Sequence, residues 1–269
     1  MNYIEIAITA NTELQETLIA LLADIDYDGF EENEENLKAF IEEEKFNETD
    51  LASILQPYDL SYSKSVIQKQ NWNELWESNF EPVIVDDFVG VRADFHPPIT
   101  GVEHEIHITP KMSFGTGHHA TTFSVMRLMK QVDFRNKTVF DFGTGTGILA
   151  ILAAKLGAKE VLAVDNDDWC VENALENVSK NNCPNIEIAK VDNAFSTKRF
   201  DVVIANINKN IILDNLSFLA DDIIKGGDII LSGLLKEDEA DIIAATASIG
   251  WQHVCTLEKG AWIAMLLKH

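Results

Sequence analysis

The fold is decided by one stretch, Val139-Phe140-Asp141-Phe142-Gly143-Thr144-Gly145-Thr146-Gly147-Ile148-Leu149-Ala150. An apolar strand runs into three glycines at alternate positions, and an apolar helix follows at once. Because glycine has no Cβ, such a turn can bend sharply and let a ligand approach the backbone. The next strand ends at Asp165, 22 residues after Gly143. A glycine turn followed by a distant carboxylate predicts a nucleotide-type site on a βαβ unit.

Two kinds of cofactor fit this pattern. A dinucleotide fingerprint, G-x-G-x-x-A, can be read from Gly145, Gly147 and Ala150, and it would place a phosphate at the N-terminus of the following helix. S-adenosylmethionine fits if Asp141 is the acid that precedes the three glycines. The amino acid group of S-adenosylmethionine would then lie along the turn, and Asp165 would accept hydrogen bonds from the ribose hydroxyls of the cofactor. We favour S-adenosylmethionine and keep a nicotinamide dinucleotide as the alternative.

Composition limits the class of protein. The chain has 269 residues, of which 46% are hydrophobic and 24% charged, so it can form two globular domains. No apolar run reaches membrane length, and the N-terminus carries acids where a signal peptide needs bases. The three cysteines show no paired or metal-type spacing. We therefore expect a cytoplasmic protein without a membrane segment.

The net charge of −23 is concentrated at the N-terminus, where residues 1–60 hold 16 acidic and 2 basic side chains. This segment would repel nucleic acid phosphates and attract a basic partner. The plainer interpretation, which the total charge by itself favours, is that acidity aids solubility. Neither interpretation predicts direct binding of nucleic acid.

Hydrophobic periodicity divides the chain into two blocks. The first shows the order βαββαβ, with strands near 3–10, 29–32, 37–42 and 61–69 and helices near 12–23 and 48–55. This order predicts a small ferredoxin-like α+β domain over 1–69. A bridging helix with an aromatic face is expected at 71–80, inside a hinge linker at 70–82. From 83 to 269 strands alternate with helices and end in an antiparallel tail, which predicts a doubly wound α/β sheet. The strands of this block are expected near 105–108, 138–140, 160–164, 186–191, 201–205, 228–231 and 262–267.

One stretch matches a calcium-loop pattern, but we do not interpret it as a metal site. Asp24, Asp26, Asp28, Gly29 and Glu35 satisfy the spacing D-x-D-x-D-G-x5-E. Position eight of the pattern is an acid where paired loops need an aliphatic residue, and the sequence has no second loop of this kind. We expect an acidic helix-to-strand turn here and no metal ion in the protein.

Two further segments are expected to meet at the glycine turn. Residues 114–122 form a second glycine-rich turn with hydroxyls, which can fold over a bound cofactor. The strand at 201–205 ends in Asn206, whose side-chain carbonyl can accept hydrogen bonds from an amine. The alternative for Asn206 is a structural role as a helix cap or in a turn. The occurrence of all three segments in this order favours the functional interpretation.

Along nearly its whole length the chain resembles the bacterial ribosomal protein L-11 methyltransferases. The matching segments lie at 71–82, 114–122, 141–150, 164–165 and 205–207. The pattern Phe-Gly-Thr-Gly-x-His-x-Thr-Thr at 114–122 is the discriminating one, because many methyltransferases share the glycine turn. Two departures are Ala120, where proline is frequent in the family, and Asn208, where an aliphatic residue is common.

The resemblance implies a class I, Rossmann-like methyltransferase domain at 83–269 and cofactor contacts at Thr122, Gly143, Asp165 and Asn206. Gly145 joins this set from the turn itself. It further implies that residues 1–69 recognise the ribosomal protein and that the hinge lets the enzyme present different amines. We expect a monomer that uses S-adenosylmethionine, releases S-adenosyl-L-homocysteine and methylates lysine side chains or the N-terminal α-amine of ribosomal protein L-11, to the trimethyl state.

Asn206 is the predicted catalytic residue. We expect its side chain and a neighbouring backbone carbonyl to orient the neutral amine while water takes the proton; His118 and His119 are secondary candidates for a base. Three alternatives stay open at this point. They are a class I methyltransferase for another basic protein or small amine, an acidic adaptor without activity, and a nicotinamide-dependent oxidoreductase.

Overall fold

The computed structural model describes residues 2–33, 36–67, 80–109 and 115–269. The chain divides into two compact units, Met1–Ser78 and Asn79–His269. The predicted domain limits, 1–69 and 83–269, fall within these units. The bridging helix predicted at 71–80 lies outside the described residues except for Phe80, so it stays a prediction.

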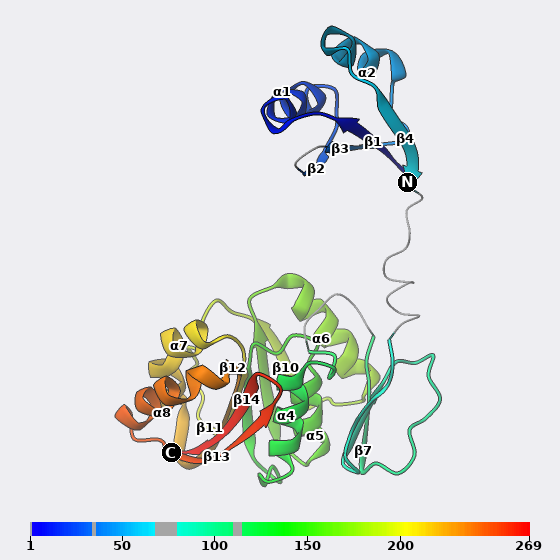
Figure 1. Cartoon of the computed structure of the whole chain (residues 1–269). Helices are drawn as coiled ribbons and strands as arrows, with labels where there is room; N and C mark the ends of the chain where they lie inside the picture. Colours follow the sequence, from blue (N-terminus) through cyan, green and yellow to red (C-terminus); the bar gives the residue numbers. More distant parts are fainter. Residues whose placement is uncertain (1, 34–35, 68–79, 110–114) are drawn as a thin grey trace. The chain divides into compact units, whose positions relative to one another are not determined.

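Along the chain of the N-terminal unit, one helix precedes and one helix follows the strand pair β2 and β3. Its elements are β1 (Tyr3–Thr9), α1 (Thr12–Ala23), β2 (Gly29–Glu32), β3 (Asn36–Glu42), α2 (Glu48–Leu55), the 3-10 turn η1 (Gln56–Tyr58) and β4 (Tyr62–Ile67) (Figure 1). The strands form an antiparallel sheet in the order β2-β3-β1-β4. The βαββαβ order is the one that the sequence predicts, and the ferredoxin-like assignment remains our interpretation of it.

Period-two alternation explains which face of this sheet is covered. Ile4, Ile6 and Ile8 of β1 are buried, while the residues between them are half-buried. They share one core with Leu18 of α1 and Leu51 of α2, so both helices pack on the same face. Of the stretch with the calcium-loop pattern, residues 24–28 form the turn between α1 and β2, Gly29 begins β2, and Glu35 lies outside the described residues. Among the described residues no group of three or more His, Cys, Asp or Glu side chains is placed to hold a metal ion.

The C-terminal unit is larger. Its elements are β5 (Val83–Val85), β6 (Val89–Arg92), β7 (His104–His107), α4 (Ala120–Met129), β8 (Thr138–Phe142), α5 (Ile148–Lys155), β9 (Glu160–Asp165), α6 (Asp168–Lys180), β10 (Ile186–Lys190), β11 (Phe200–Asn206), α7 (Lys209–Asp222), β12 (Ile223–Leu235), the 3-10 turn η2 (Lys236–Asp238), α8 (Glu239–Ser248), β13 (Gln252–Lys259) and β14 (Trp262–Lys268). Strands and helices alternate over most of its length, as expected.

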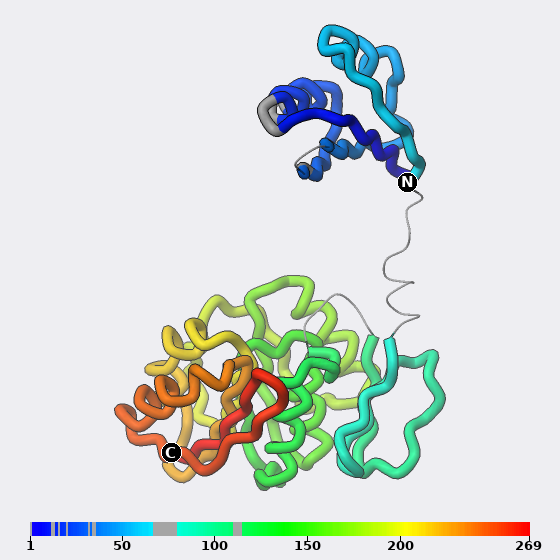
Figure 2. Tube along the Cα trace, in the orientation of Figure 1, coloured from blue at the N-terminus to red at the C-terminus, as the bar shows by residue number. Residues whose placement is uncertain are grey.

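Seven of these strands form one sheet in the order β10-β9-β8-β11-β12-β14-β13. The pairs from β10 to β12 are parallel, and β14 runs antiparallel to both of its neighbours. Figure 2 traces this path from the green central strands to the red C-terminal hairpin. The order reverses between β8 and β11, since β9 and β10 lie on one side and β12 on the other. Open α/β sheets bind ligands at the carboxyl ends of the strands at such a switch point.

The strand predicted near 105–108 forms, but it does not join the main sheet. As β7 it pairs in parallel with β6, which pairs antiparallel with β5, in a separate three-stranded sheet. The sequence pattern does not predict β5, β6 and β13. The first two are three and four residues long, too short to show a periodicity, and β13 is largely solvent-exposed.

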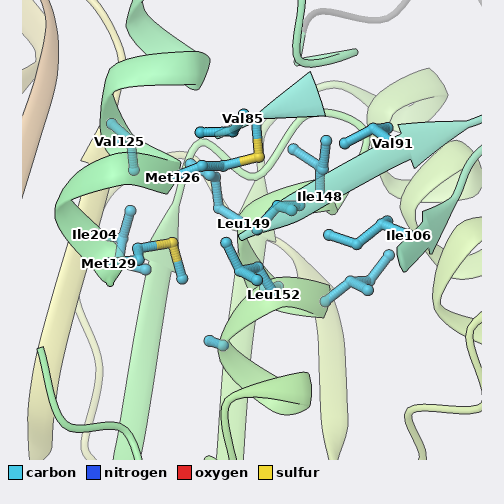
Figure 3. Close-up of a cluster of buried hydrophobic side chains, with 14 of the residues drawn as sticks. Val85, Val91, Ile106, Val125, Met126, Met129, Ile148, Leu149, Leu152 and Ile204 are labelled. Carbon is cyan, nitrogen blue, oxygen red and sulfur yellow. The ribbon is translucent and has the colours of Figure 1, made fainter. Parts of the chain in front are cut away.

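The parallel strands divide their side chains between two cores. Val139 and Ile204 belong to the core beneath α4, α5 and α6, whereas Phe140 and Val203 belong to the core beneath α7 and α8. This is the alternation expected for strands covered on both faces. In the first core the small sheet contributes its own apolar side chains, and Figure 3 shows Val85 beside Met126 of α4 and Val91 and Ile106 on the side of Ile148 of α5.

We predict that Asp222→Asn stabilises the protein at neutral pH. Burial raises the pKa of Asp222, at the end of α7, to about 6. Because the folded pKa lies above the unfolded value, this group lowers stability as the pH rises from about 4 to 6, and the cost persists at higher pH. We expect a gain on the order of 1 kcal/mol at pH 7.5 after allowing for solvent screening, and none at pH 4.

Denaturant unfolding of the wild type and the variant at both pH values measures this gain. Asp221→Asn is the matched control, since it removes the neighbouring exposed carboxylate from the same helix. A gain of equal size at pH 4 would contradict the electrostatic explanation.

Candidate active site

The glycine turn after β8 needs glycine at its first position. Gly143 has φ +78°, a left-handed conformation that side chains rarely adopt. A Cβ built on Gly143 would lie 2.2 Å from Cγ2 of Ile207, the residue after β11. A Cβ on Gly233 of β12 would lie 2.2 Å from the Ile207 carbonyl oxygen. Ile207 is therefore clamped between two glycines, and this clamp positions its neighbour Asn206.

Asp165, at the end of β9, is bonded directly to the turn. Its Oδ2 accepts a hydrogen bond of 2.9 Å from the Gly145 N–H, and its Oδ1 accepts one of 3.2 Å from the Asp167 N–H. The Val164 carbonyl accepts the N–H groups of Gly143 and Thr144, both at 2.9 Å. The acid that the sequence placed 22 residues away is thus part of the turn, with a carboxylate held in a single orientation.

Asp141 lies in the interior, directly before the turn. It is fully buried, and its Oδ2 accepts a 2.6 Å hydrogen bond from the Thr144 hydroxyl. Burial raises the pKa of Asp141 to about 7 and the negative charge of Asp165 adds to the effect, while hydrogen bonds from the Thr144 hydroxyl and the Ala150 N–H offset part of the rise. A buried carboxyl with a raised pKa directly before a ligand-type turn is a candidate functional group.

The second glycine turn is tied to the first. The Thr146 hydroxyl donates a 2.7 Å hydrogen bond to the carbonyl of Gly115. His118 has both ring nitrogens engaged, with the Thr116 hydroxyl at 3.1 Å and the Glu81 carbonyl at 2.9 Å. Phe114, the first residue of the predicted segment, lies outside the described residues. These contacts give His118 a role in shaping the turn, and its use as a base finds no support in them.

His119 occupies the N-cap of α4. Its Nδ1 accepts a 3.3 Å hydrogen bond from the Thr121 N–H and lies 2.8 Å from the Thr121 hydroxyl. The ring meets Trp262 of β14 edge to face, with 4.8 Å between centroids. A ring nitrogen that caps a helix is less available to take a proton from an amine, so a base role for His119 stays an unsupported prediction.

Asn206 ends β11 at the switch point. Its side chain is 7% exposed, and its Nδ2 donates a 3.2 Å hydrogen bond to the hydroxyl of Thr122. Its Oδ1 is buried and has no partner among the described residues. The amide therefore retains one free acceptor, which is the group that a neutral amine requires.

A cavity of about 820 Å³ opens at the carboxyl ends of the central strands, within the range of ligand pockets. It brings together Gly143, Gly145, Asp165 and Asn206, which are four of the five predicted site residues. Thr122 is fully buried and is not among the residues that line it. The glycine turn, the Asp165 carboxylate and the Asn206 amide therefore line the same cavity.

Several lining residues were not identified from the sequence. Asp192 and Asn193 follow β10, Asp214 lies on α7, and Trp262 begins β14. Asp192 and Asn193 could have been found, because they follow the third parallel strand and carboxyl ends of such strands share an edge. Asp214 and Trp262 come from elements distant in sequence, and no local pattern marks them.

The charges that line the cavity select the cofactor. They belong to Asp165, Asp167, Asp192 and Asp214, and no Lys or Arg lines the cavity among the described residues. Four carboxylates without a cation disfavour a pyrophosphate and favour a positively charged ligand. S-adenosylmethionine carries a sulfonium and an ammonium group, so it fits, and a dinucleotide does not. The fold and the site together define a class I S-adenosylmethionine-dependent methyltransferase.

Comparison with known proteins identifies the family. The model of the ribosomal protein L11 methyltransferase (PrmA) family matches residues 2–269. The chain is 37% identical over 276 residues to the ribosomal protein L11 methyltransferase of Phocaeicola vulgatus, covering 98% of both chains. It is 39% identical over 256 residues to that of Porphyromonas gingivalis, covering 92% of this chain and 88% of the relative.

A solved structure agrees. The crystal structure of ribosomal protein L11 methylase from Lactobacillus delbrueckii subsp. bulgaricus is similar with a TM-score of 0.66 at 31% identity, over 71% of this chain and 100% of that one. The chain belongs to the ribosomal protein L11 methyltransferase family. In the part of the chain that the structure describes, no helix is long and apolar enough to cross a membrane.

We predict that Asp141 makes cofactor binding pH-dependent. Its pKa of about 7 means that a cation bound at the turn favours its ionised form and displaces a proton. Affinity for S-adenosylmethionine should therefore rise about three- to tenfold from pH 5.5 to 7.5, as the carboxylate ionises. Calorimetry in buffers of different ionisation enthalpy measures both the affinity and the released proton.

Asp141→Asn should flatten the profile and abolish the proton release near pH 7. Asp222→Asn is the control, because it removes another buried carboxylate with a raised pKa, located at the end of α7 and not next to the glycine turn. An unchanged slope in Asp141→Asn would show that another group titrates.

Proposed function

We propose that this chain transfers methyl groups from S-adenosylmethionine to amines of ribosomal protein L11. The proposed acceptors are lysine side chains and the N-terminal α-amine, and the proposed end state is trimethylated. The free Oδ1 of Asn206 at the switch point carries the proposal, because it supplies the hydrogen-bond acceptor that a neutral amine needs. The full-length match to a family named for this substrate supports it.

S-adenosylmethionine supplies an activated methyl group on a sulfonium sulfur and leaves as S-adenosylhomocysteine. What the protein must add is alignment of an amine that has lost its proton. A lysine has a reference pKa near 10.4, so the neutral form is scarce at pH 7. Correct orientation of two reactants is worth up to about 7–11 kcal/mol, which makes positioning the main contribution of the site.

Asn206 is the residue that we assign to this positioning. Its Oδ1 accepts an N–H of the amine, a neighbouring backbone carbonyl accepts a second one, and the lone pair is left to face the methyl group. Asp165 and the turn hold the cofactor, with the Asp165 carboxylate available to ribose hydroxyls. Asp192 can accept from an exocyclic amine of the adenine base. Water takes the proton that the acceptor amine loses.

The N-terminal unit is proposed to recognise the protein substrate. Its strong negative charge suits a basic partner. The hinge predicted at 70–82 lies outside the described residues except for 80–82, and it stays a prediction. We further propose that the enzyme acts as a cytoplasmic monomer without direct contact to nucleic acid. Sedimentation of the free enzyme tests whether it is a monomer, and sedimentation of its mixture with L11 tests whether the two proteins bind.

We predict stepwise addition of methyl groups when recombinant L11 is incubated with the enzyme and S-adenosylmethionine. Intact-mass spectrometry follows each added methyl group, and peptide sequencing locates it. Asp165→Ala should raise the cofactor Kd by at least about tenfold, because the turn loses a bonded carboxylate.

Asp168→Ala is the control for this variant. Asp168 is an exposed carboxylate three residues further on, and it pairs with Lys190 at 2.7 Å. If L11 gains no methyl group while the cofactor binds normally, the acceptor is another basic protein or a small amine, and the proposed substrate is wrong.

We predict that Asn206→Ala slows the first methyl transfer more than the third. A neutral primary amine has two N–H groups, a monomethyl amine has one and a dimethyl amine has none, so the contact with Oδ1 is lost as methylation proceeds. The first transfer should slow by about tenfold to a hundredfold, and transfer to dimethyl-lysine should change little.

Rapid-quench mass spectrometry on unmodified and dimethylated L11 measures the two rates, and calorimetry measures cofactor affinity. Asn185→Ala is the matched control, since Asn185 lies before β10 at the opposite end of the sheet and donates to the Ala158 carbonyl. Equal slowing of all three transfers would mean that Asn206 acts on the cofactor and not on the amine.

A further inference from the structure

One asparagine of α6 ties the first glycine turn (143–147) to the chain that leads into the second (114–122). We propose that Asn177 is a positioning residue for cofactor binding, because it fixes the backbone of the first turn from behind. Its side chain is fully buried, and it acts through Thr146. The inference goes beyond the proposed function, since it concerns cofactor affinity and does not depend on which amine the enzyme methylates.

The side-chain amide of Asn177 has three hydrogen bonds to protein groups. Its Nδ2 donates to the Thr146 carbonyl at 2.8 Å and to Oδ1 of Asn173 at 2.7 Å, and its Oδ1 accepts the Thr109 N–H at 2.7 Å. A backbone N–H only donates and a backbone carbonyl only accepts, so these partners allow one orientation of the amide. Asn177 therefore holds together two backbone segments that lie 68 and 31 residues before it in the chain.

Thr146 is the residue at which the two glycine turns are joined. It is fully buried; its hydroxyl donates to the Gly115 carbonyl at 2.7 Å, and its carbonyl accepts from Asn177. Thr109 is the last described residue before the second turn, and Gly115 is the first described residue within it. The chain is thus held to Thr146 on both sides of residues 110–114, directly at Gly115 and through Asn177 at Thr109.

The position of Thr146 matters for the cofactor because its neighbours border the cavity. Gly143 and Gly145 line it, and the Gly145 N–H donates to Asp165 at 2.9 Å. His119, in the second turn, lines the same cavity. A displacement of Thr146 would move the two glycines relative to both Asp165 and the second turn. Loss of the Asn177 amide should therefore weaken cofactor binding although no group that lines the cavity has been removed.

Asn181, one helical turn further along α6, offers a matched control. It is buried, its Oδ1 accepts the His107 N–H at 3.0 Å, and its Nδ2 donates to the His107 carbonyl at 2.6 Å. It also donates to the Asn177 carbonyl at 2.8 Å, and none of the side-chain hydrogen bonds that the described residues give to Asn181 reaches the first glycine turn. Both asparagines attach α6 to the end of β7 and the residues after it, but Asn177 alone of the two also holds the turn.

Asn177→Ala should raise the Kd of S-adenosylmethionine about tenfold, the effect expected when a buried hydrogen bond is lost. Asn181→Ala should leave this Kd within about twofold. Asn177→Leu keeps the branched shape of the side chain and removes all three hydrogen bonds, so it should weaken binding as Asn177→Ala does. Calorimetry on the full-length protein measures each affinity, and thermal unfolding shows that each variant is folded at the temperature used.

A second readout uses the cofactor-free protein. The backbone N–H of Gly145, which is bonded to Asp165, gives one proton–nitrogen resonance. This resonance should shift in Asn177→Ala and in Asn177→Leu and should stay in place in Asn181→Ala. A residue that merely stabilises α6 would lower the unfolding temperature without moving the Gly145 resonance.

Two results would overturn the inference. One is a cofactor Kd within twofold of the wild-type value in folded Asn177→Ala and Asn177→Leu. The other is an equal loss of affinity in Asn181→Ala, because packing of the whole helix would then set the affinity. Neither comparison uses an acceptor amine, so a failure of L11 to gain methyl groups leaves both tests valid and is distinguishable from a failure of this inference.

Discussion

The clamp on Ile207 is the contact on which the site depends. Gly143 after β8 and Gly233 in β12 lie so close to this residue that neither has space for a Cβ. Three strands that are adjacent in the sheet but far apart in sequence thus end in van der Waals contact. Because Asn206 directly precedes Ile207, the same contact fixes the position of the Asn206 backbone at the carboxyl edge of the sheet. Glycine at position 233 lets the strand approach the backbone of Ile207, and glycine at position 143 leaves space for the Ile207 side chain.

Electrostatics then decides which ligand this edge accepts. A helix N-terminus next to a glycine turn usually favours anions, such as the pyrophosphate of a dinucleotide. Here Asp165 already accepts the Gly145 N–H, and three further carboxylates line the same cavity. Asp141 adds a titrating charge beneath the turn. A cationic cofactor and a cationic side chain both lower the repulsion among these groups, whereas a pyrophosphate would raise it.

Hydrogen-bond polarity supplies the final selectivity. At the site, Oδ1 of Asn206 is a buried acceptor that has no partner among the described residues. Unpartnered acceptors are complementary to ammonium and amine groups, which donate hydrogen bonds. The site is therefore prepared for the nitrogen atoms of its ligands before they bind.

The sequence by itself determined the type of fold, the glycine turn, Asp165 and Asn206, because each follows a strand whose apolar pattern is local. It also determined the βαββαβ order of the N-terminal unit, for the same reason. Only the tertiary structure decided that β7 leaves the main sheet, that Asp214 and Trp262 join the cavity, and that Thr122 faces Asn206. Those contacts join residues tens of positions apart, and packing of whole elements, not local periodicity, brings them together.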